Sequence, residues 1–390
     1  MPSAVLTPYE QVPETKEKLD WAELVTLDLS EFEKPGGKQR LASQLEHAAH
    51  HVGFFYVKNF GISQQEVDRQ FALGREFYDL PLEERLKYHN IEDLERGEYN
   101  GYRPSGLRQI VEGVKDNIQV YNTPKFDGFH KRAQPKVLQT HIEEIEKFSR
   151  DIHEQVVQKL LRILAVVLEL DDEDQLARDH VYDKKGEDHL RYMHYKARTP
   201  EENEKIGGLY AAGHTDLGTI TLLFRQPVAA LQILNSENEW KWVKPQDATI
   251  TVNICDALSA LTGGYLKSSI HRVHTPPKDQ AHIDRLGVLF FARLLQYSIQ
   301  LTLHMTDAGR PNNHVVLETI SNSPVLNRGN FKANDFTALG KKLTVEEWVK
   351  VRQTQQQRRT KPREVTKDGK YMYAEKDLEI IPGLTAKIYN

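Results

Sequence analysis

The spacing of hydrophobic residues along the chain changes from a helical period to a strand-like period near residue 190. Residues 38–51 carry apolar side chains three or four positions apart, which predicts an amphipathic helix. The same rhythm runs without Pro or Gly from Leu138 to Leu170 and predicts one long helix. Beyond it, short alternating or continuous apolar runs predict strands at 189–197, 213–224, 231–234, 240–243, 249–254, 265–273 and 286–292.

Many short strands after a helical segment are typical of a double-stranded β-helix, a distorted jelly roll that encloses a ligand between two sheets. We therefore expect an α+β, mainly β fold with a jelly-roll core at 189–305 and flanking helices. Residues 1–125 form an N-terminal region of helices and strands, and 126–188 hold the long helix and its connection. Residues 306–390 add a C-terminal helix and tail.

The N-terminal region contains its own regular elements. Alternating residues predict strands at 24–32 and 53–62, whereas 98–120 reads as a less regular segment. Ser63 with Glu66 three positions later is the pattern of a helix that begins with a capping box.

Composition narrows the class of protein. The chain has 390 residues and a net charge of −4 without a basic run, so nucleic acid is not an expected partner. Its single cysteine, Cys255, excludes an internal disulfide and a cysteine-based zinc site, and we expect it to be a packed small residue. No apolar run approaches the roughly 18 residues of a membrane span, so we expect a cytoplasmic protein without membrane contact. The oligomeric state cannot be predicted from the sequence.

A metal site is predicted within residues 213–273. His214 and Asp216 stand two positions apart in a strand-like run, so their side chains share one face. His271, at the end of another strand-like run, is the best candidate for a third ligand. Two histidines and a carboxylate on one side of an ion form the facial triad of non-haem Fe(II) sites.

These residues also carry a family resemblance. The runs GHTDLGTITLLF from Gly213, GYLKSSIHRV from Gly264 and the pair Phe290–Phe291 follow one another in the family's order. The chain thereby resembles the 2-oxoglutarate- and Fe(II)-dependent dioxygenases of the isopenicillin N synthase-like class, and fungal members in particular around RYMHYKARTPEEN. The resemblance implies Fe(II) bound by His214, Asp216 and His271, with 2-oxoglutarate and O₂ as co-substrates.

The resemblance implies further site residues. Arg285 corresponds to the family's anchor for the distal carboxylate of 2-oxoglutarate, and its planar fork suits a bidentate grip. Tyr195 corresponds to the tyrosine that helps to hold the co-substrate. Two positions depart from the family pattern, because Gly287 replaces a serine and Met193 replaces an asparagine.

Candidates for substrate contact lie in the irregular segment 98–120, since such loops often line sites. They are Tyr102, Arg103, Arg108 and Asn117. Five further histidines are expected to be structural or exposed: His189, His194, His274, His282 and His304. The region after Thr306, with a helix predicted from Thr344, is expected to shape the substrate mouth.

The expected function is Fe(II)/2-oxoglutarate-dependent oxidation of an unactivated C–H bond in a small organic molecule, in secondary metabolism. Hydroxylation, desaturation and ring formation remain open as outcomes. One alternative is an Fe(II)-dependent oxidase that does not use 2-oxoglutarate, which the departures at Gly287 and Met193 allow. The other is a non-catalytic ligand-binding protein, because one fold hosts many functions.

Overall fold

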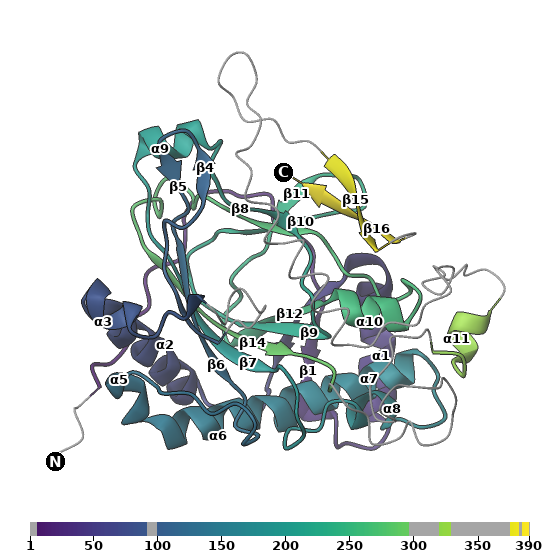
Figure 1. The fold of residues 1–390 in the computed structure, drawn as a ribbon. Helices are drawn as coiled ribbons and strands as arrows, with labels where there is room; N and C mark the ends of the chain where they lie inside the picture. The colour runs from purple at the N-terminus through teal and green to yellow at the C-terminus, as the bar shows by residue number, and fades with distance from the viewer. Residues whose placement is uncertain (1–5, 92–99, 296–319, 329–374, 382–383, 390) are drawn as a thin grey trace.

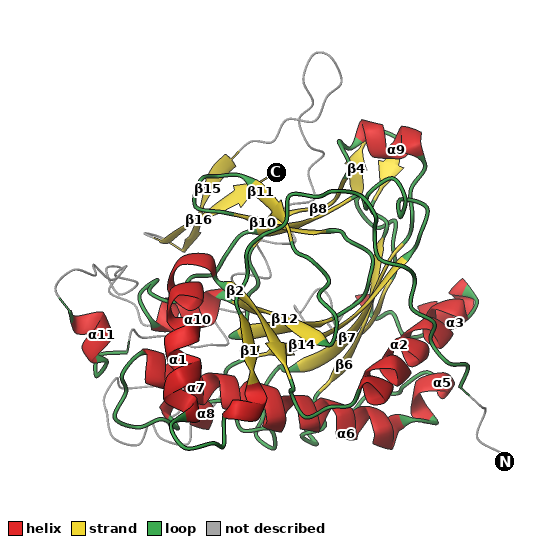
Figure 2. Cartoon of the chain, turned by 180° about the vertical axis from the view of Figure 1, so that it is seen from behind, coloured by secondary structure: helices red, strands yellow, loops and turns green. Residues whose placement is uncertain are grey.

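Two facing β-sheets form the centre of the protein, with helices packed against one of them (Figures 1 and 2). The computed structural model describes residues 6–91, 100–295, 320–328, 375–381 and 384–389. The predicted helix from Thr344 lies outside this part. Two facing sheets with helices against one of them confirm the expected double-stranded β-helix core and its flanking helices.

The larger sheet has eight strands in the order β1-β2-β12-β9-β14-β7-β6-β3. Their bounds are β1 Thr26–Asp28, β2 Phe54–Lys58, β3 Gly101–Arg103, β6 Ile118–Pro124, β7 His189–Tyr195, β9 Ile220–Phe224, β12 Thr249–Ile254 and β14 Arg285–Ala292. Four of these strands come from residues 1–125, so the N-terminal region and the core share one sheet.

The smaller sheet has four strands in the order β11-β10-β13-β8. They are β8 Leu209–His214, β10 Leu231–Leu234, β11 Trp240–Trp242 and β13 His271–His274. Two separate hairpins complete the described strands: β4 Gln109–Val111 with β5 Val114–Lys115, and β15 Glu375–Ile381 with β16 Leu384–Tyr389.

Helices cover the outer face of the larger sheet (Figure 1). The helices are α1 Gly37–His47, α2 Gln64–Asp79, α3 Leu82–Leu86, α5 Lys136–Gln139, α6 Ile142–Ile152, α7 Gln158–Val167, α8 Gln175–Arg178, α9 Pro200–Lys205, α10 Asp256–Leu261 and α11 Pro324–Asn327. Buried side chains of α2, α6 and α7 form one core with outward residues of β7 and β14, among them Tyr192 and Phe290. Alternation along each strand then turns every second residue toward the space between the sheets.

Several predicted elements are confirmed. Helix α2 begins at Ser63, whose side chain accepts from the Glu66 amide while the Glu66 carboxylate accepts from the Ser63 amide, so the capping box is present. The long helix runs from Ile142 to Val167 through one π-helical turn at His153–Val157. It is interrupted at Thr140 and His141, so α5 is a separate helix.

Other sequence expectations were wrong in detail. Residues 98–120 are more regular than predicted, because β3 and the start of β6 belong to the larger sheet and β4 and β5 form a hairpin. The run 213–224 is two strands in different sheets, and the run 265–273 becomes a strand only at His271. A crossing between sheets leaves the apolar pattern almost unchanged, since both strands bury their side chains.

No helix among the described residues is long and apolar enough to cross a membrane.

Candidate metal and co-substrate site

His214 and His271 lie side by side on the smaller sheet. His214 ends β8, His271 begins β13, and the two are direct cross-strand partners. Their ring centroids are 4.4 Å apart. Cross-strand pairs hold side chains at such distances without help from a ligand, so the sheet itself brings the two imidazoles together.

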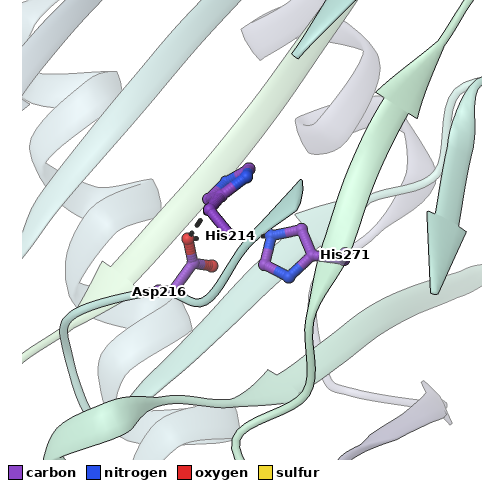
Figure 3. A group of neighbouring side chains, drawn as sticks. All are labelled: His214, Asp216 and His271. Carbon is purple, nitrogen blue, oxygen red and sulfur yellow. Dashed lines mark ion pairs between the residues drawn. The ribbon is translucent and has the colours of Figure 1, made fainter. Parts of the chain in front are cut away.

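Asp216 completes the group from a different position than the sequence suggests. It lies just beyond the end of β8, in the connection that crosses to β9 of the larger sheet. Its Oδ1 atom is 3.9 Å from Nε2 of His214 and 3.8 Å from Nε2 of His271 (Figure 3). The expectation of one strand carrying both ligands was wrong, and the turn between the sheets aims the carboxylate at the rings.

Hydrogen bonds fix the orientation of both imidazoles. Nδ1 of His214 lies 2.8 Å from the Ala212 carbonyl, and Nδ1 of His271 lies 3.2 Å from the Ser269 carbonyl. A carbonyl only accepts, so each Nδ1 carries the proton and each Nε2 presents its lone pair toward Asp216. Such bonds select the tautomer that a metal-binding histidine needs.

The carboxylate of Asp216 is kept ionised. Burial raises its pKa, whereas the positive charge of the His271 and His214 rings when they are protonated, with hydrogen bonds from Asn253 and Thr221, lowers it, and the net result is a pKa below the usual value. Nδ2 of Asn253 donates to Asp216 Oδ2 at 3.1 Å, which leaves Oδ1 directed at the imidazoles.

The three side chains fit a metal ion. Their ligand atoms all lie within 4.8 Å of one another, and the described part of the chain holds no second group of this kind. Two imidazoles and one carboxylate are the donor set of mononuclear Fe(II) oxygenases. The donor chemistry therefore fits the Fe(II) that the sequence resemblance implies.

Arg285 is a buried cation with no carboxylate partner among the residues that the structure describes. Only 5% of its surface is exposed, and its Nε donates to the Val228 carbonyl at 3.4 Å. It lines a narrow cavity between the sheets with apolar side chains that include Leu223 and Leu231. Burial lowers its pKa, and no described acid forms an ion pair with it. A buried guanidinium in this state favours binding of an anion.

Tyr195 lies opposite Arg285 on the neighbouring strand β7. The guanidinium carbon is 5.8 Å from the centre of its ring, which also stacks on Tyr210. Burial raises the pKa of Tyr195 to about 12, so the phenol keeps its proton and can donate it in a hydrogen bond.

The two departures from the family pattern face each other. Gly287 and Met193 are cross-strand partners on β14 and β7, in the same inward row as Arg285 and Tyr195. A Cβ atom at Gly287 would meet its nearest neighbour, Leu289 Cδ1, at 3.4 Å, which is an ordinary contact. The missing side chain is therefore not required by packing.

The four candidates for substrate contact occupy different surroundings. Arg103 lies on the inward side of β3 and forms a 2.9 Å ion pair with Asp116. Arg108 stands beside the β4–β5 hairpin, where its backbone bonds to Asp116. Asn117 donates to the Lys196 carbonyl at 2.6 Å.

Tyr102 faces away from the space between the sheets. It is buried among the helices, donates to Gln119 Oε1 at 2.6 Å and packs edge-on against Phe77 of α2. The expectation of substrate contact was wrong for Tyr102, because alternation along β3 sends Arg103 inward and its neighbour outward.

The remaining histidines and the cysteine are placed largely as expected. His194 packs on Tyr78, His274 against Trp242, and His282 is exposed. Cys255 is fully buried, and burial raises its pKa. His304 lies outside the described residues.

Sequence reasoning missed two inward residues. Asn253, which orients Asp216, was not among the residues that the sequence analysis singled out. Arg191 was not considered, although it stands four positions before Tyr195 and therefore on the same face of β7. That even spacing was the available signal.

Sequence profiles identify two known segments in the chain. Residues 24–137 match the family described as "non-haem dioxygenase in morphine synthesis N-terminal", and residues 187–294 match the 2OG-Fe(II) oxygenase superfamily. The second segment contains all three candidate metal ligands, together with Arg285 and Tyr195.

Individual relatives agree with the profiles. A UPF0676 protein of Schizosaccharomyces pombe is 30% identical over 260 residues, which is 65% of this chain and 78% of that protein. The 2-oxoglutarate-dependent dioxygenase citB of Monascus ruber is 28% identical over 273 residues, 65% of this chain and 78% of its own. The structure of full-length Neurospora crassa T7H in complex with alpha-KG covers 87% of this chain and 100% of its own, with a TM-score of 0.70 at 22% identity. The chain therefore belongs to the 2OG-Fe(II) oxygenase superfamily.

Proposed function

We propose that this protein is an Fe(II)/2-oxoglutarate-dependent oxygenase that oxidises a C–H bond of a small organic molecule, with His214, Asp216 and His271 as its iron ligands. The observation that carries the proposal is the convergence of two oriented imidazoles and an ionised carboxylate within 4.8 Å. Relatives named as 2-oxoglutarate-dependent dioxygenases of fungi support it and favour a place in secondary metabolism.

The bound iron, with 2-oxoglutarate and O₂, supplies the oxidising chemistry that side chains lack. The chain's own residues have other tasks. Backbone carbonyls hold the Nε2 atoms of His214 and His271 toward one point, and Asn253 turns Asp216 to the same point. Such preorganisation removes the cost of arranging ligands during turnover.

Arg285 is assigned to the distal carboxylate of 2-oxoglutarate, and the protonated hydroxyl of Tyr195 is assigned as a neighbouring donor. The support is the absence of any described carboxylate that pairs with Arg285, together with its position opposite Tyr195. A charge-assisted pair offsets the desolvation of both groups. The lining of the cavity is mainly apolar, which strengthens such a pair.

An oxidase that does not use 2-oxoglutarate is the second candidate, because Gly287 and Met193 remove two polar groups that the family usually offers. The unpaired charge of Arg285 favours the first candidate. A non-catalytic binding protein is disfavoured by the complete donor set, since a role in ligand binding alone would not require it.

The test is anaerobic titration of the full chain with Fe(II) and 2-oxoglutarate, followed by a small-molecule screen for O₂-dependent succinate release. We expect one iron per chain and binding of 2-oxoglutarate to the iron-loaded protein. His271→Ala should lose iron while retaining the fold, and His282→Ala, which changes an exposed histidine, is the matched control. Full iron content in His271→Ala would remove this residue from the site, and turnover without 2-oxoglutarate would favour the oxidase.

A further inference from the structure

Five arginines stand on the inward face of the larger sheet, or directly after its strands, and three of them are neutralised. Arg103 pairs with Asp116, Arg225 with Glu14 and Arg293 with Glu187. No described acid lies within ion-pair distance of the other two, Arg285 and Arg191. The co-substrate accounts for one of these cations and leaves the second available for another anion.

Arg191 is held by neutral groups on one side only. Its Nε donates to Asn122 Oδ1 at 2.7 Å, and Nη2 lies 3.4 Å from Nε2 of His189. The His189 ring is neutral, because burial lowers its pKa well below the usual value, and its Nδ1 bonds the Glu187 carbonyl. A guanidinium has more N–H donors than these contacts use. Nη1 has no hydrogen-bond partner among the described residues.

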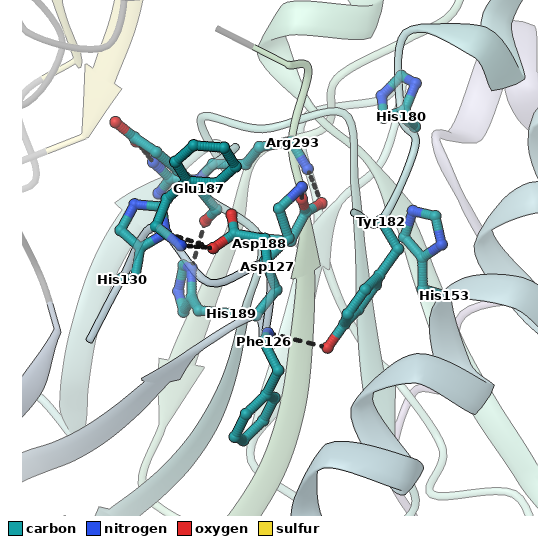
Figure 4. A network of polar contacts seen from close by, with 12 residues as sticks. Phe126, Asp127, His130, His153, His180, Tyr182, Glu187, Asp188, His189 and Arg293 are labelled. Atoms are coloured by element: carbon teal, nitrogen blue, oxygen red, sulfur yellow. Dashed lines mark hydrogen bonds and ion pairs between the residues drawn. The ribbon is translucent and has the colours of Figure 1, made fainter. Parts of the chain in front are cut away.

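The guanidinium is rigidly placed. It lies over the ring of Phe291, with its carbon 4.4 Å from the ring centre, and His189 stacks on the same Phe291 with ring centroids 4.7 Å apart. The start of β7, where His189 sits, is anchored by a buried ion pair between Lys125 and Asp188 at 2.9 Å. Figure 4 shows Asp188 and Glu187 converging on Arg293 in this region.

The strand register connects Arg191 to the metal ligands. Asn253, which bonds Asp216, is the cross-strand partner of Thr221, and Thr221 is the partner of Phe291. The Phe291 ring also carries the Arg191 guanidinium, so this row of inward residues links Arg191 to the residue that orients Asp216. Asp216 and Arg191 also interact electrostatically. An anion bound at Arg191 would therefore lie in the same space between the sheets as the candidate metal ligands.

Arg85 shows how this fold satisfies the hydrogen-bond donors of an arginine that has a structural role. Arg85, which is buried, meets three neutral acceptors: the Leu80 carbonyl, the Tyr102 hydroxyl and Gln119 Oε1. It lies on the outer side of the sheet, among the helices. Arg191 instead faces the space between the sheets with donors unused, and an unpaired charge there is costly until an anion binds.

We propose that Arg191 is a specificity-determining residue that binds a carboxylate of the primary substrate, so that the enzyme acts on small organic acids. This inference rests on the proposed function, because it assigns Arg285 to 2-oxoglutarate and leaves Arg191 for the substrate. The planar fork of arginine matches a carboxylate, and the Phe291 ring beside it offers an apolar surface to the carbon skeleton.

The experiment uses the full chain loaded anaerobically with Fe(II) and 2-oxoglutarate. Matched probe pairs, benzoate with benzamide and hexanoate with hexanamide, are titrated by thermal shift and by the visible absorption of the loaded site. We expect wild-type protein to prefer each acid over its amide. Arg191→Gln should remove that preference, with acid binding weakened roughly 30-fold or more, and Arg191→Lys should restore part of it. Arg162→Gln, which removes the same charge from an exposed pair on α7, is the control.

The outcomes separate the inference from the proposed function. If wild-type protein shows no preference for acids, or if the preference survives Arg191→Gln, the inference is overturned. If 2-oxoglutarate binding is unchanged in Arg191→Gln while acid binding falls, the assignment of one anion to each arginine stands. Failure of wild-type protein to bind 2-oxoglutarate at all would instead refute the proposed function on which the inference rests.

Discussion

Substitution of Arg285 by Gln tests the co-substrate assignment most directly. The guanidinium is 5% exposed and no described carboxylate pairs with it, so a bound 2-oxoglutarate would leave its distal carboxylate buried without a countercharge in the variant. Loss of one partner of a buried charge pair costs about 2–5 kcal/mol. Affinity for 2-oxoglutarate should therefore fall roughly 30-fold to several thousandfold, since about 1.4 kcal/mol corresponds to a factor of ten.

Arg285→Gln should not weaken the stability of the ligand-free protein, although it weakens the binding of 2-oxoglutarate. Arg285 is a desolvated cation when no anion is bound, so Arg285→Gln should leave the unfolding midpoint of the ligand-free protein unchanged or higher. Iron content should stay normal, because no ligand changes. Arg285→Lys should recover only part of the affinity, since lysine keeps the charge without the fork.

The assay is anaerobic titration of 2-oxoglutarate into Fe(II)-loaded protein, followed by absorption and by calorimetry. Arg162→Gln is a suitable control, because this arginine pairs with Asp174 away from the cavity that Arg285 lines. An unchanged affinity in Arg285→Gln, with full iron content, would refute the reasoning and reassign the unpaired charge to another ligand.

Three further predictions concern other residues. A Cβ at Gly287 meets ordinary contacts, so Gly287→Ser should fold and tighten 2-oxoglutarate binding by about 0.5–1.5 kcal/mol through one new hydrogen bond; a weaker affinity in the same titration would contradict this. Lys125→Met should cost about 3–5 kcal/mol in urea unfolding because it strands buried Asp188, whereas Lys147→Met breaks only exposed pairs and should cost less than about 1 kcal/mol. Burial lowers the pKa of His180 to about 4, whereas in the unfolded chain its pKa is about 6.5. Between these two pH values the unfolded chain binds a proton that the folded chain does not, so the free energy of unfolding falls as the pH drops from about 6.5 to 4. His180→Gln should flatten that slope in urea unfolding measured across this range, and an unchanged slope would exclude the histidine as its source.

The sequence by itself determined the local features of this protein. The capping box at Ser63 and the long helix through 142–167 follow from interactions between residues three or four positions apart, which a sequence displays directly. The three candidate metal ligands were also predicted from the sequence, because their residue types, their order and their flanking motifs together are typical of few other kinds of site.

The tertiary structure decided how those candidate ligands meet and what surrounds them. Asp216 reaches the imidazoles from the connection that crosses between the two sheets, and His271 meets His214 because their strands pair in that register. Neither the strand register nor the change of sheet alters the spacing of apolar residues, so the sequence pattern could not predict them. The same limit explains Tyr102, since only the pairing of β3 fixes which of its residues face inward. The contrast between paired and unpaired arginines depends on acids distant in sequence, so only the folded chain could single out Arg191.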